Sequence, residues 1–329
     1  MSLHIIKGGL IDTMQDGGRR GYQHLGINTG GVMDHFSARL ANALLGKELD
    51  APVLELHFPA STLAFTRETV ICVTGADFTP LLNDAPLALN QPVVVARDSQ
   101  LKFTGVRQGS WCYLSLLHPL KLEPWLGSYS THLKGETGGF KGRALRKGDV
   151  LEWAKAEDLA PRLSGALTHT LPWKAVGLHA LTGDELCILY GSEWHWLTAE
   201  SREALLHNTY YVLPSSDRMG YQLTGEPLKA AHSSQLVSSG VSFGTVQLLP
   251  NGGLIVLMAD GQTTGGYPRI AHVVSAHLPL LAQLKPHEGF RFCLADGAKA
   301  EKKLVEQQDY LHTLQQTCAL KLKNWIHAH

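Results

Sequence analysis

A net charge, a long apolar run and a paired-cysteine motif are all missing from this sequence of 329 residues. Lys plus Arg and Asp plus Glu number 29 each, so electrostatics give no reason to expect a nucleic acid or a membrane surface as a partner. No apolar run is long enough to cross a bilayer. Residues 1–7 lack the basic and apolar regions of a secretory signal peptide. We therefore expect a cytoplasmic protein.

Cysteine is scarce, and metal-binding motifs are missing. None of the five cysteines forms a CxxC pair, and most of them stand in apolar, strand-like runs. Such thiols are typical of reduced core residues in a cytoplasmic protein. Histidine is abundant at 17 residues, but there is neither an HExxH motif nor a tight His/Cys cluster. No metal site is predicted.

Glycine, by contrast, is plentiful and gathers in polar loops. The densest is residues 260–269, which follow an apolar run predicted to be a buried strand. Its ten residues supply a carboxylate, an amide, two hydroxyls, a phenol, a guanidinium and three glycines. Glycine lets the backbone approach another group closely, and successive N–H groups can form an anion-binding nest. A functional loop and a wide turn between strands both remain open, and the density of functional groups favours the first.

Three more segments combine charge with glycine or turn-forming residues: residues 13–23, 127–143 and 215–221. For residues 13–23 taken alone, a surface turn with solvated charges is the simpler explanation. The repeated sequence Thr-Gly-Gly-aromatic, at residues 137–140 and 264–267, hints at a duplicated unit.

The chain between these loops reads as short β-strands. Residues 52–117 alternate β-forming runs with turn signals at even spacing, which is typical of a sandwich or barrel. Asp34 is a predicted N-cap of a helix that stops near Gly46, and Glu55 is expected to face solvent from its strand. The second half repeats the pattern, with residues 193–208 helical and Ser201 as the expected N-cap.

We therefore predict a mainly β protein with two domains. The first spans residues 1–153 and the second residues 174–297, joined by a polar, proline-containing linker at 154–173. Apolar residues at helical spacing predict a C-terminal helical tail over residues 298–329.

Taken in order, the loops resemble the biotin-dependent carboxyltransferase-like family. That family includes the C subunit of 5-oxoprolinase, the KipI antagonist KipA, the second allophanate-hydrolase-type subunit, and part of the urea carboxylase carboxyltransferase domain. The resemblance covers about residues 5–294 and implies two tandem cyclophilin-like β-barrels with a few short helices. The matching stretches are residues 13–22, 30–42, 74–76, 127–131, 138–143, 216–223, 244–247, 260–270 and 278–286.

The resemblance implies a component of a larger assembly. In the first interpretation the chain is part of an ATP-dependent 5-oxoprolinase, a hydrolase component active only in complex with a KipI-like B subunit, together with an amidohydrolase-like A subunit. The substrate 5-oxoproline is a stable cyclic amide, and phosphorylation of its lactam oxygen would make it a better electrophile for water. ATP with Mg²⁺ is expected in the complex. The chain has no biotin-attachment Met-Lys-Met and no Walker A motif, so neither covalent biotin nor a P-loop is expected on it.

Two alternatives remain open. One is an allophanate- or urea-type carboxyltransferase subunit, which would depend on biotin carried by another protein. The other is a non-catalytic regulatory protein that binds a KipI-like partner.

The resemblance also nominates site residues. Arginines and glycine nests would hold a phosphoryl group, aspartates would orient the arginines or hold Mg²⁺, and residues 262–264 would hydrogen-bond the lactam or its carboxylate. Bracing of loops by Asp–Arg pairs such as Asp217–Arg218 is the competing interpretation. The predicted catalytic residues are Asp217, Arg218, Asp260 and Arg269. The predicted substrate- or nucleotide-binding residues are Asp16, Arg19, Gly138, Gly139, Arg143, Gln262, Thr263, Thr264, Gly265, Gly266 and Tyr267.

The sequence departs from the family pattern at three positions. Ser239 stands where a glutamate is usual, Gly261 where an arginine is usual, and His277 where an aspartate is usual. If those charged groups bind ligand, substrate preference or activity is altered here.

Overall fold

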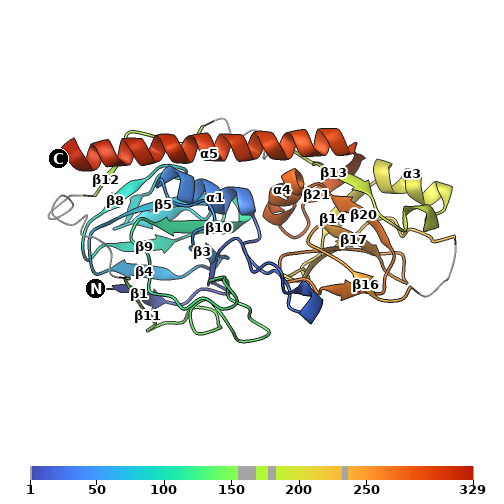
Figure 1. Cartoon of the computed structure of the whole chain (residues 1–329), viewed down its shortest axis with the longest axis horizontal. Coiled ribbons are helices and arrows are strands. Elements are labelled where there is room, and N and C mark those ends of the chain that lie inside the picture. The colour runs from blue at the N-terminus through green and yellow to red at the C-terminus, as the bar shows by residue number, and fades with distance from the viewer. Residues whose placement is uncertain (1, 155–167, 177–182, 232–235, 329) are drawn as a thin grey trace. The chain divides into compact units, whose positions relative to one another are not determined.

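The computed structural model describes residues 2–154, 168–176, 183–231 and 236–328 (Figure 1). The chain divides into two compact units. Unit 1 contains residues 1–18, 34–178 and 308–329, and unit 2 contains residues 19–33 and 179–307. Strands dominate both units, which confirms the predicted mainly β fold. In the part of the chain that is described, no helix is both long and apolar enough to span a membrane.

Unit 1 is built from two antiparallel six-stranded sheets whose apolar faces share one core. Leu3 and Phe65 of the first sheet and Val73 and Leu114 of the second are fully buried in it. The first sheet has the order β11 (Val150–Glu152), β1 (Ser2–Lys7), β4 (Thr62–Phe65), β9 (Gln100–Phe103), β6 (Pro80–Leu82), β7 (Ala85–Pro86). The second has the order β12 (His169–Thr170), β8 (Val93–Val95), β5 (Thr69–Asp77), β10 (Gln108–Leu116), β3 (Val53–Leu56), β2 (Thr13–Gln15).

Helix α1 (His35–Leu44) begins and ends in unit 1 as its sequence predicts. The Ser37 N–H donates to Asp34 Oδ1 at 2.8 Å, which confirms Asp34 as the N-cap. Gly46 follows the helix with φ of 63°, a conformation that favours glycine. A Cβ at Gly46 would lie 2.6 Å from the Cα of Ala319 in the last helix, α5 (Gly297–Ala328). Gly46 therefore permits close packing of α5 in unit 1.

Unit 2 is a closed seven-stranded barrel. Its pairs are antiparallel except β13–β21, which is parallel. A two-stranded ribbon, β16 (Ser239–Gly240) and β19 (Thr264–Gly265), stands beside the barrel strands in the same unit. The barrel order is β13 (Glu185–Tyr190), β20 (Arg269–Val273), β17 (Thr245–Leu248), β18 (Leu254–Leu257), β15 (Gly220–Thr224), β14 (Thr209–Val212), β21 (Gly289–Leu294). Among its described residues, the unit contains η1 (Gln23–Leu25), η3 (Trp194–Trp196), α3 (Ala199–His207), η4 (Ser275–His277), α4 (Leu278–Gln283) and the first turns of α5.

Two local predictions were wrong. The N-cap of α3 is Thr198, whose hydroxyl accepts the Ser201 N–H, because the helix begins three residues earlier than its apolar spacing suggested. Glu55 does not face solvent: it is fully buried, and the Tyr113 hydroxyl donates to its Oε2 at 2.9 Å. A hydrogen-bonded partner on β10 thus replaces water around this carboxylate.

The compact units also differ from the predicted domain boundaries. Residues 19–33 belong to unit 2, although they lie within the first predicted domain. Residues 155–167 of the predicted linker lie outside the described residues. The described end of the linker packs in unit 1, where β12 pairs with β8 and Trp173 Nε1 donates to Leu44 O at 3.1 Å. The predicted C-terminal helix is confirmed as α5.

Candidate functional site

Loop 260–269 of unit 2 is fixed at its first residue by a forked ion pair. Arg218 donates from Nε to Asp260 Oδ2 at 2.8 Å and from Nη2 to Oδ1 at 3.1 Å. The Asp260 N–H in turn donates to the Arg218 carbonyl at 2.8 Å. Both side chains are largely buried, with 4% and 10% of their surfaces exposed. Planar two-point pairing of this kind sets orientation as well as charge, so Arg218 and Asp260 hold the start of the loop.

Residues 19–33, within the same unit, add further contacts to this pair. Arg218 Nη2 also donates to the Gly31 carbonyl at 2.7 Å, and Asn28 Nδ2 donates to the Asp260 carbonyl at 2.9 Å. Arg19 is only 1% exposed. Its guanidinium lies against Gly30, where an added Cβ would be 2.8 Å from Nη1. The structure thus brings the predicted residues Arg19, Arg218 and Asp260 into one unit.

A second forked pair fixes the other end of the loop. Arg269 donates to both carboxylate oxygens of Glu193, at 2.9 and 2.8 Å, and its backbone N–H donates to the same carboxylate at 3.0 Å. The Arg269 hydrogen bond holds the pKa of Glu193 below its usual value, and the same bond raises the pKa of Arg269. Arg269 Nη1 also donates to the Gly240 carbonyl at 3.2 Å. The charge of Arg269 is therefore already matched by Glu193.

Between the two pairs, the loop presents polar groups above a buried amide. Gln262, Thr264 and Tyr267 are exposed, whereas Gln247 of β17 is fully buried. Gln247 Nε2 makes a long contact of 3.5 Å to the Tyr267 carbonyl. A Cβ at Gly265 would come within 2.6 Å of that nitrogen, so any larger residue here would have to displace the Gln247 amide.

Two buried oxygen atoms in this part of unit 2 lack partners. Among the described residues, neither Gln247 Oε1 nor Ser239 Oγ has a hydrogen-bond partner. Ser239 lies directly opposite Gly265 in the β16–β19 ribbon, and the Gln247 side chain also lies next to Gly265. Both residues with an unpartnered oxygen are therefore neighbours of the same glycine. An unsatisfied buried polar group costs about 1–3 kcal/mol. A ligand with complementary groups would remove that cost.

His272 of β20 adds a neutral imidazole to the same unit. Its ring lies 3.3 Å from the Thr245 hydroxyl at Nε2. Burial, and secondarily the charge of Arg269, lowers the pKa of His272. The imidazole is therefore uncharged at neutral pH.

Asp217 does not orient Arg218, contrary to the interpretation of these adjacent residues as a pair. Its Oδ1 accepts the N–H groups of Met219 at 2.7 Å and Gly220 at 3.2 Å, and its side chain is exposed. This is a short turn in which aspartate satisfies its own backbone. Arg218 pairs with Asp260 instead, because the two backbones are hydrogen-bonded to each other.

Asp16 lies in unit 1, where it is saturated by donors. Its Oδ1 accepts the Gly18 N–H and the hydroxyls of Ser128 and Ser130 at 2.6–2.8 Å, and its Oδ2 accepts the Tyr129 N–H at 2.6 Å. A carboxylate with four such bonds holds a loop together. It ties residues 128–130 to the end of β2.

The glycine-rich segment at 138–143 is also tied internally. Gly139 has φ of 54°, and a Cβ there would lie against the Thr131 hydroxyl. Gly138 has φ of 67°, and its carbonyl accepts the Gly142 N–H at 2.9 Å. Arg143 forms a forked pair with Asp149, 2.7 Å at each bond, and this pairing lowers the pKa of Asp149. All of these contacts are made within unit 1.

Two of the departures from the family pattern, Gly261 and His277, have different structural surroundings. Gly261 does not have a positive φ, and a Cβ there would be 3.0 Å from the Met258 carbonyl. His277 Nδ1 accepts the Cys187 N–H at 3.0 Å, and burial, helped by Lys303, lowers the pKa of His277 to about 4. His277 is thus a neutral hydrogen-bond acceptor within unit 2.

ATP with Mg²⁺ stays an expectation for the complex, and the described residues show no preformed cluster of metal ligands. They contain no group of three or more His, Cys, Asp or Glu side chains that could hold a metal ion. Arg143, Arg218 and Arg269 each already form a forked pair with a carboxylate. Phosphate would have to displace those partners.

The fold and the loop pattern agree with one family. The chain belongs to the family described as carboxyltransferase domain, subdomain A and B, whose sequence model matches residues 25–294. It is similar to the C subunit of 5-oxoprolinase from Escherichia coli, at 33% identity over 95% of this chain and 97% of that protein. It is also similar to the C subunit of 5-oxoprolinase from Haemophilus influenzae, at 34% identity over 88% of this chain and 91% of that protein.

A solved structure agrees with the family assignment. The K. lactis urea amidolyase matches 95% of this chain with a TM-score of 0.84 and 28% sequence identity. This chain spans only 20% of that protein, which is therefore much larger.

Several residues of the site were not nominated from the sequence, and Glu193 and Gln247 are the two on which its geometry depends most. Glu193 was missed because it is 76 residues from Arg269 in the chain. Gln247 did carry a signal, because it is an amide inside the apolar strand β17. A polar side chain that is buried there costs free energy unless it has a hydrogen-bond partner.

Proposed function

We propose that this chain is the C subunit of an ATP-dependent 5-oxoprolinase, which opens 5-oxoproline to glutamate. It acts in complex with a KipI-like B subunit, together with an amidohydrolase-like A subunit. Two relatives that carry the name of this 5-oxoprolinase component match it over nearly their whole lengths. The match to urea amidolyase of Lachancea kluyveri, at 29% identity, covers only 18% of that protein.

The observation that carries the proposal is the unpartnered oxygen of buried Gln247 below the exposed loop 262–267. A lactam offers one N–H donor and one carbonyl acceptor side by side. Gln247 Oε1 accepts the lactam N–H, and the hydroxyls of Ser239 and Thr264 donate to the carbonyl or carboxylate of the substrate. A site built around such bonds discriminates strongly against ligands that lack the matching group.

The two forked pairs have a positioning role in this account. Arg218 with Asp260 and Glu193 with Arg269 fix the two ends of the loop, so that the groups between them are held in place before substrate arrives. No step of the reaction is assigned to ATP on these residues, because their charges are already paired. ATP with Mg²⁺ remains an expectation for the assembled complex.

Substitution of Gln247 in the assembled complex tests the site. Gln247→Leu keeps the volume and removes the unsatisfied oxygen, so the chain should melt at the same or a slightly higher temperature. kcat/KM for 5-oxoproline should fall at least about tenfold, because the lactam N–H loses its acceptor. The matched control is Gln222→Leu, an exposed glutamine on β15. Equal kcat/KM in wild type and Gln247→Leu would refute the assignment of the lactam to this site.

The carboxyl-transfer function is the second candidate, favoured by the TM-score of 0.84 to the urea amidolyase structure. It requires biotin on another protein. Loss of activity on addition of avidin would therefore support it, whereas a 5-oxoprolinase is indifferent to avidin. A purely regulatory KipI-binding protein would instead form a tight heterodimer without turnover.

A further inference from the structure

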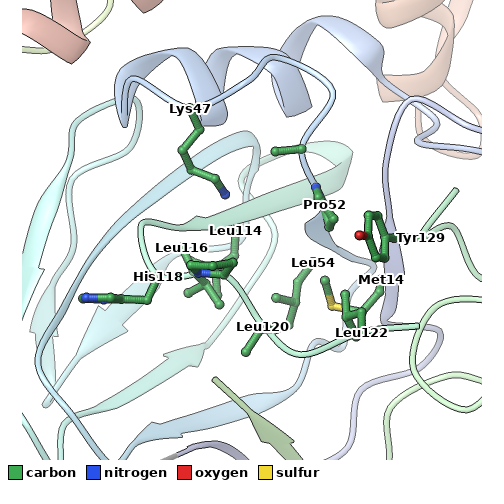
Figure 2. A pocket seen from close by; sticks show the side chains of 12 residues that line it. Met14, Lys47, Pro52, Leu54, Leu114, Leu116, His118, Leu120, Leu122 and Tyr129 are labelled. Carbon is green, nitrogen blue, oxygen red and sulfur yellow. The ribbon is translucent and has the colours of Figure 1, made fainter. Parts of the chain in front are cut away.

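A pocket of about 130 Å³ lies within unit 1 and is lined by none of the candidate site residues (Figure 2). Its walls come from β3, β10, the segment after α1 and the chain that follows β10. Most of the lining is aliphatic and well buried, including Met14, Leu54, Leu114 and Leu116. An apolar cavity of about 150 Å³ accommodates benzene. The space is thus large enough for a small organic ligand. We call it the Lys47 pocket.

Lys47 brings a single amine into this apolar space. Figure 2 shows its side chain reaching down toward Leu114 and Leu116. Lys47 Nζ donates to the Ser115 hydroxyl at 3.0 Å, and that hydroxyl donates to Asn42 Oδ1 at 2.6 Å. No carboxylate forms an ion pair with Lys47 among the described residues. Lys47 as a whole is half-buried, but its amine lies against the apolar lining, where a lysine is rarely found without an anionic partner.

The other titratable side chains of the pocket supply no negative charge. His118 lies 3.1 Å from Arg67 Nη2 through Nε2 and 2.9 Å from the Thr69 hydroxyl through Nδ1. Arginine only donates, so Nε2 accepts and the imidazole is neutral. Asp16 holds Tyr129 through its backbone N–H, and the Tyr129 hydroxyl points toward the pocket interior in Figure 2. The pocket is therefore aliphatic with one cationic donor and one hydroxyl.

We propose that the Lys47 pocket binds a small aliphatic monocarboxylate of about five carbons. Its carboxylate pairs with the Lys47 amine, and its alkyl chain packs among the leucines. The ligand supplies both features that the pocket lacks, an anion for the amine and apolar atoms for the space. The polar lactam of 5-oxoproline does not suit it, because that ring would leave its own N–H and carbonyl unpaired between leucines. This site is independent of the proposed function.

Binding should be coupled to proton uptake. Burial lowers the pKa of Lys47 to about 7, so most of the amine is neutral at pH 8. A carboxylate at hydrogen-bond distance favours the ammonium form. Pentanoate binding at pH 8 should therefore take up close to one proton from buffer, whereas an uncharged analogue takes up none.

The test is calorimetric titration of the full chain with sodium pentanoate and with pentanamide, in two buffers of different ionisation enthalpy. We expect pentanoate to bind at least about tenfold more tightly than pentanamide, with proton uptake. Lys47→Met should abolish the preference and the uptake. Ala51→Phe, which fills the pocket and leaves the amine in place, should abolish binding. The control Lys134→Met, at an exposed lysine, should behave as wild type.

Three results would overturn the proposal. They are no pentanoate binding at millimolar concentration, equal affinity for the amide, and unchanged binding in Ala51→Phe. The last variant keeps the test decisive even if Lys47→Met does not fold.

Discussion

At the scale of the residue, Gln247 and Lys47 are polar side chains in apolar surroundings with different consequences. Gln247 has an oxygen without a partner among the described residues, whereas half-buried Lys47 keeps one hydrogen bond but loses part of its hydration. The first cost is independent of pH, since an amide does not titrate. The second depends on pH, because desolvation disfavours only the charged ammonium and the amine can become neutral by releasing a proton.

This difference predicts how Lys47→Met changes stability. The pKa of Lys47 is about 7 when folded and near its ordinary 10.5 when unfolded. Between these values the unfolded chain binds more protons, so wild-type stability rises with pH. Lys47→Met should therefore be more stable than wild type at neutral pH and below, and its advantage should shrink toward pH 10. Melting curves across this range, compared with Lys134→Met, measure it. A constant difference would contradict the buried amine.

At the scale of the element, loop 260–269 depends on the pairs at its ends. Glu193→Gln should lower the free energy of unfolding by about 1–3 kcal/mol at pH 7, because Arg269 loses a charged partner. The pKa of Glu193 is depressed in the folded state, so this stabilisation exists above the unfolded pKa and disappears as pH falls through the folded pKa. Urea unfolding at pH 7 and at a series of lower pH values measures both statements. Glu185→Gln, at a more exposed pair with Arg291, is the control and should change little.

Helix α5 gives the second prediction at this scale. Gly46→Ala should destabilise unit 1 by more than the roughly 1–3 kcal/mol of backbone strain, because its Cβ also meets Ala319. Gly148→Ala is the matched control: φ is 88°, and a Cβ there meets nothing within 4 Å. Urea unfolding of both variants isolates the contact with α5. Equal losses would show that this contact contributes nothing.

Elements bounded by local signals were predicted, and those set by distant partners were not. Asp34 and Gly46 mark the ends of α1 through neighbours in sequence, and both predictions held. The partners of Arg269 and Arg218 lie 76 and 42 residues away, at distances that a pattern in one sequence does not encode. Asp217 and Arg218 are adjacent in the sequence, which suggested an ion pair between them. In the structure Asp217 accepts backbone N–H groups of its own turn, and Arg218 pairs with Asp260. The loop itself was found because its composition is local information.

At the scale of the whole molecule, the sequence predicted the mainly β fold but not the composition of the units. Residues 19–33 join unit 2, where Asn28 bonds to Asp260 and Gly31 bonds to Arg218, partners that come more than 180 residues later in the chain. The spacing of glycines along the chain does not indicate that residues 19–33 contact these distant partners. Even spacing of strands, in contrast, is visible along the chain, and it correctly indicated a mainly β fold built from sheets and a barrel.

The central claim is that this chain is a necessary subunit of a 5-oxoprolinase. The direct measurement is glutamate formation from 5-oxoproline by the purified chain together with its KipI-like and amidohydrolase-like partners. We expect ATP-dependent glutamate that disappears when this chain is omitted and returns when it is added back. A stable complex that forms no glutamate, or one whose rate is unchanged without this chain, would contradict the claim.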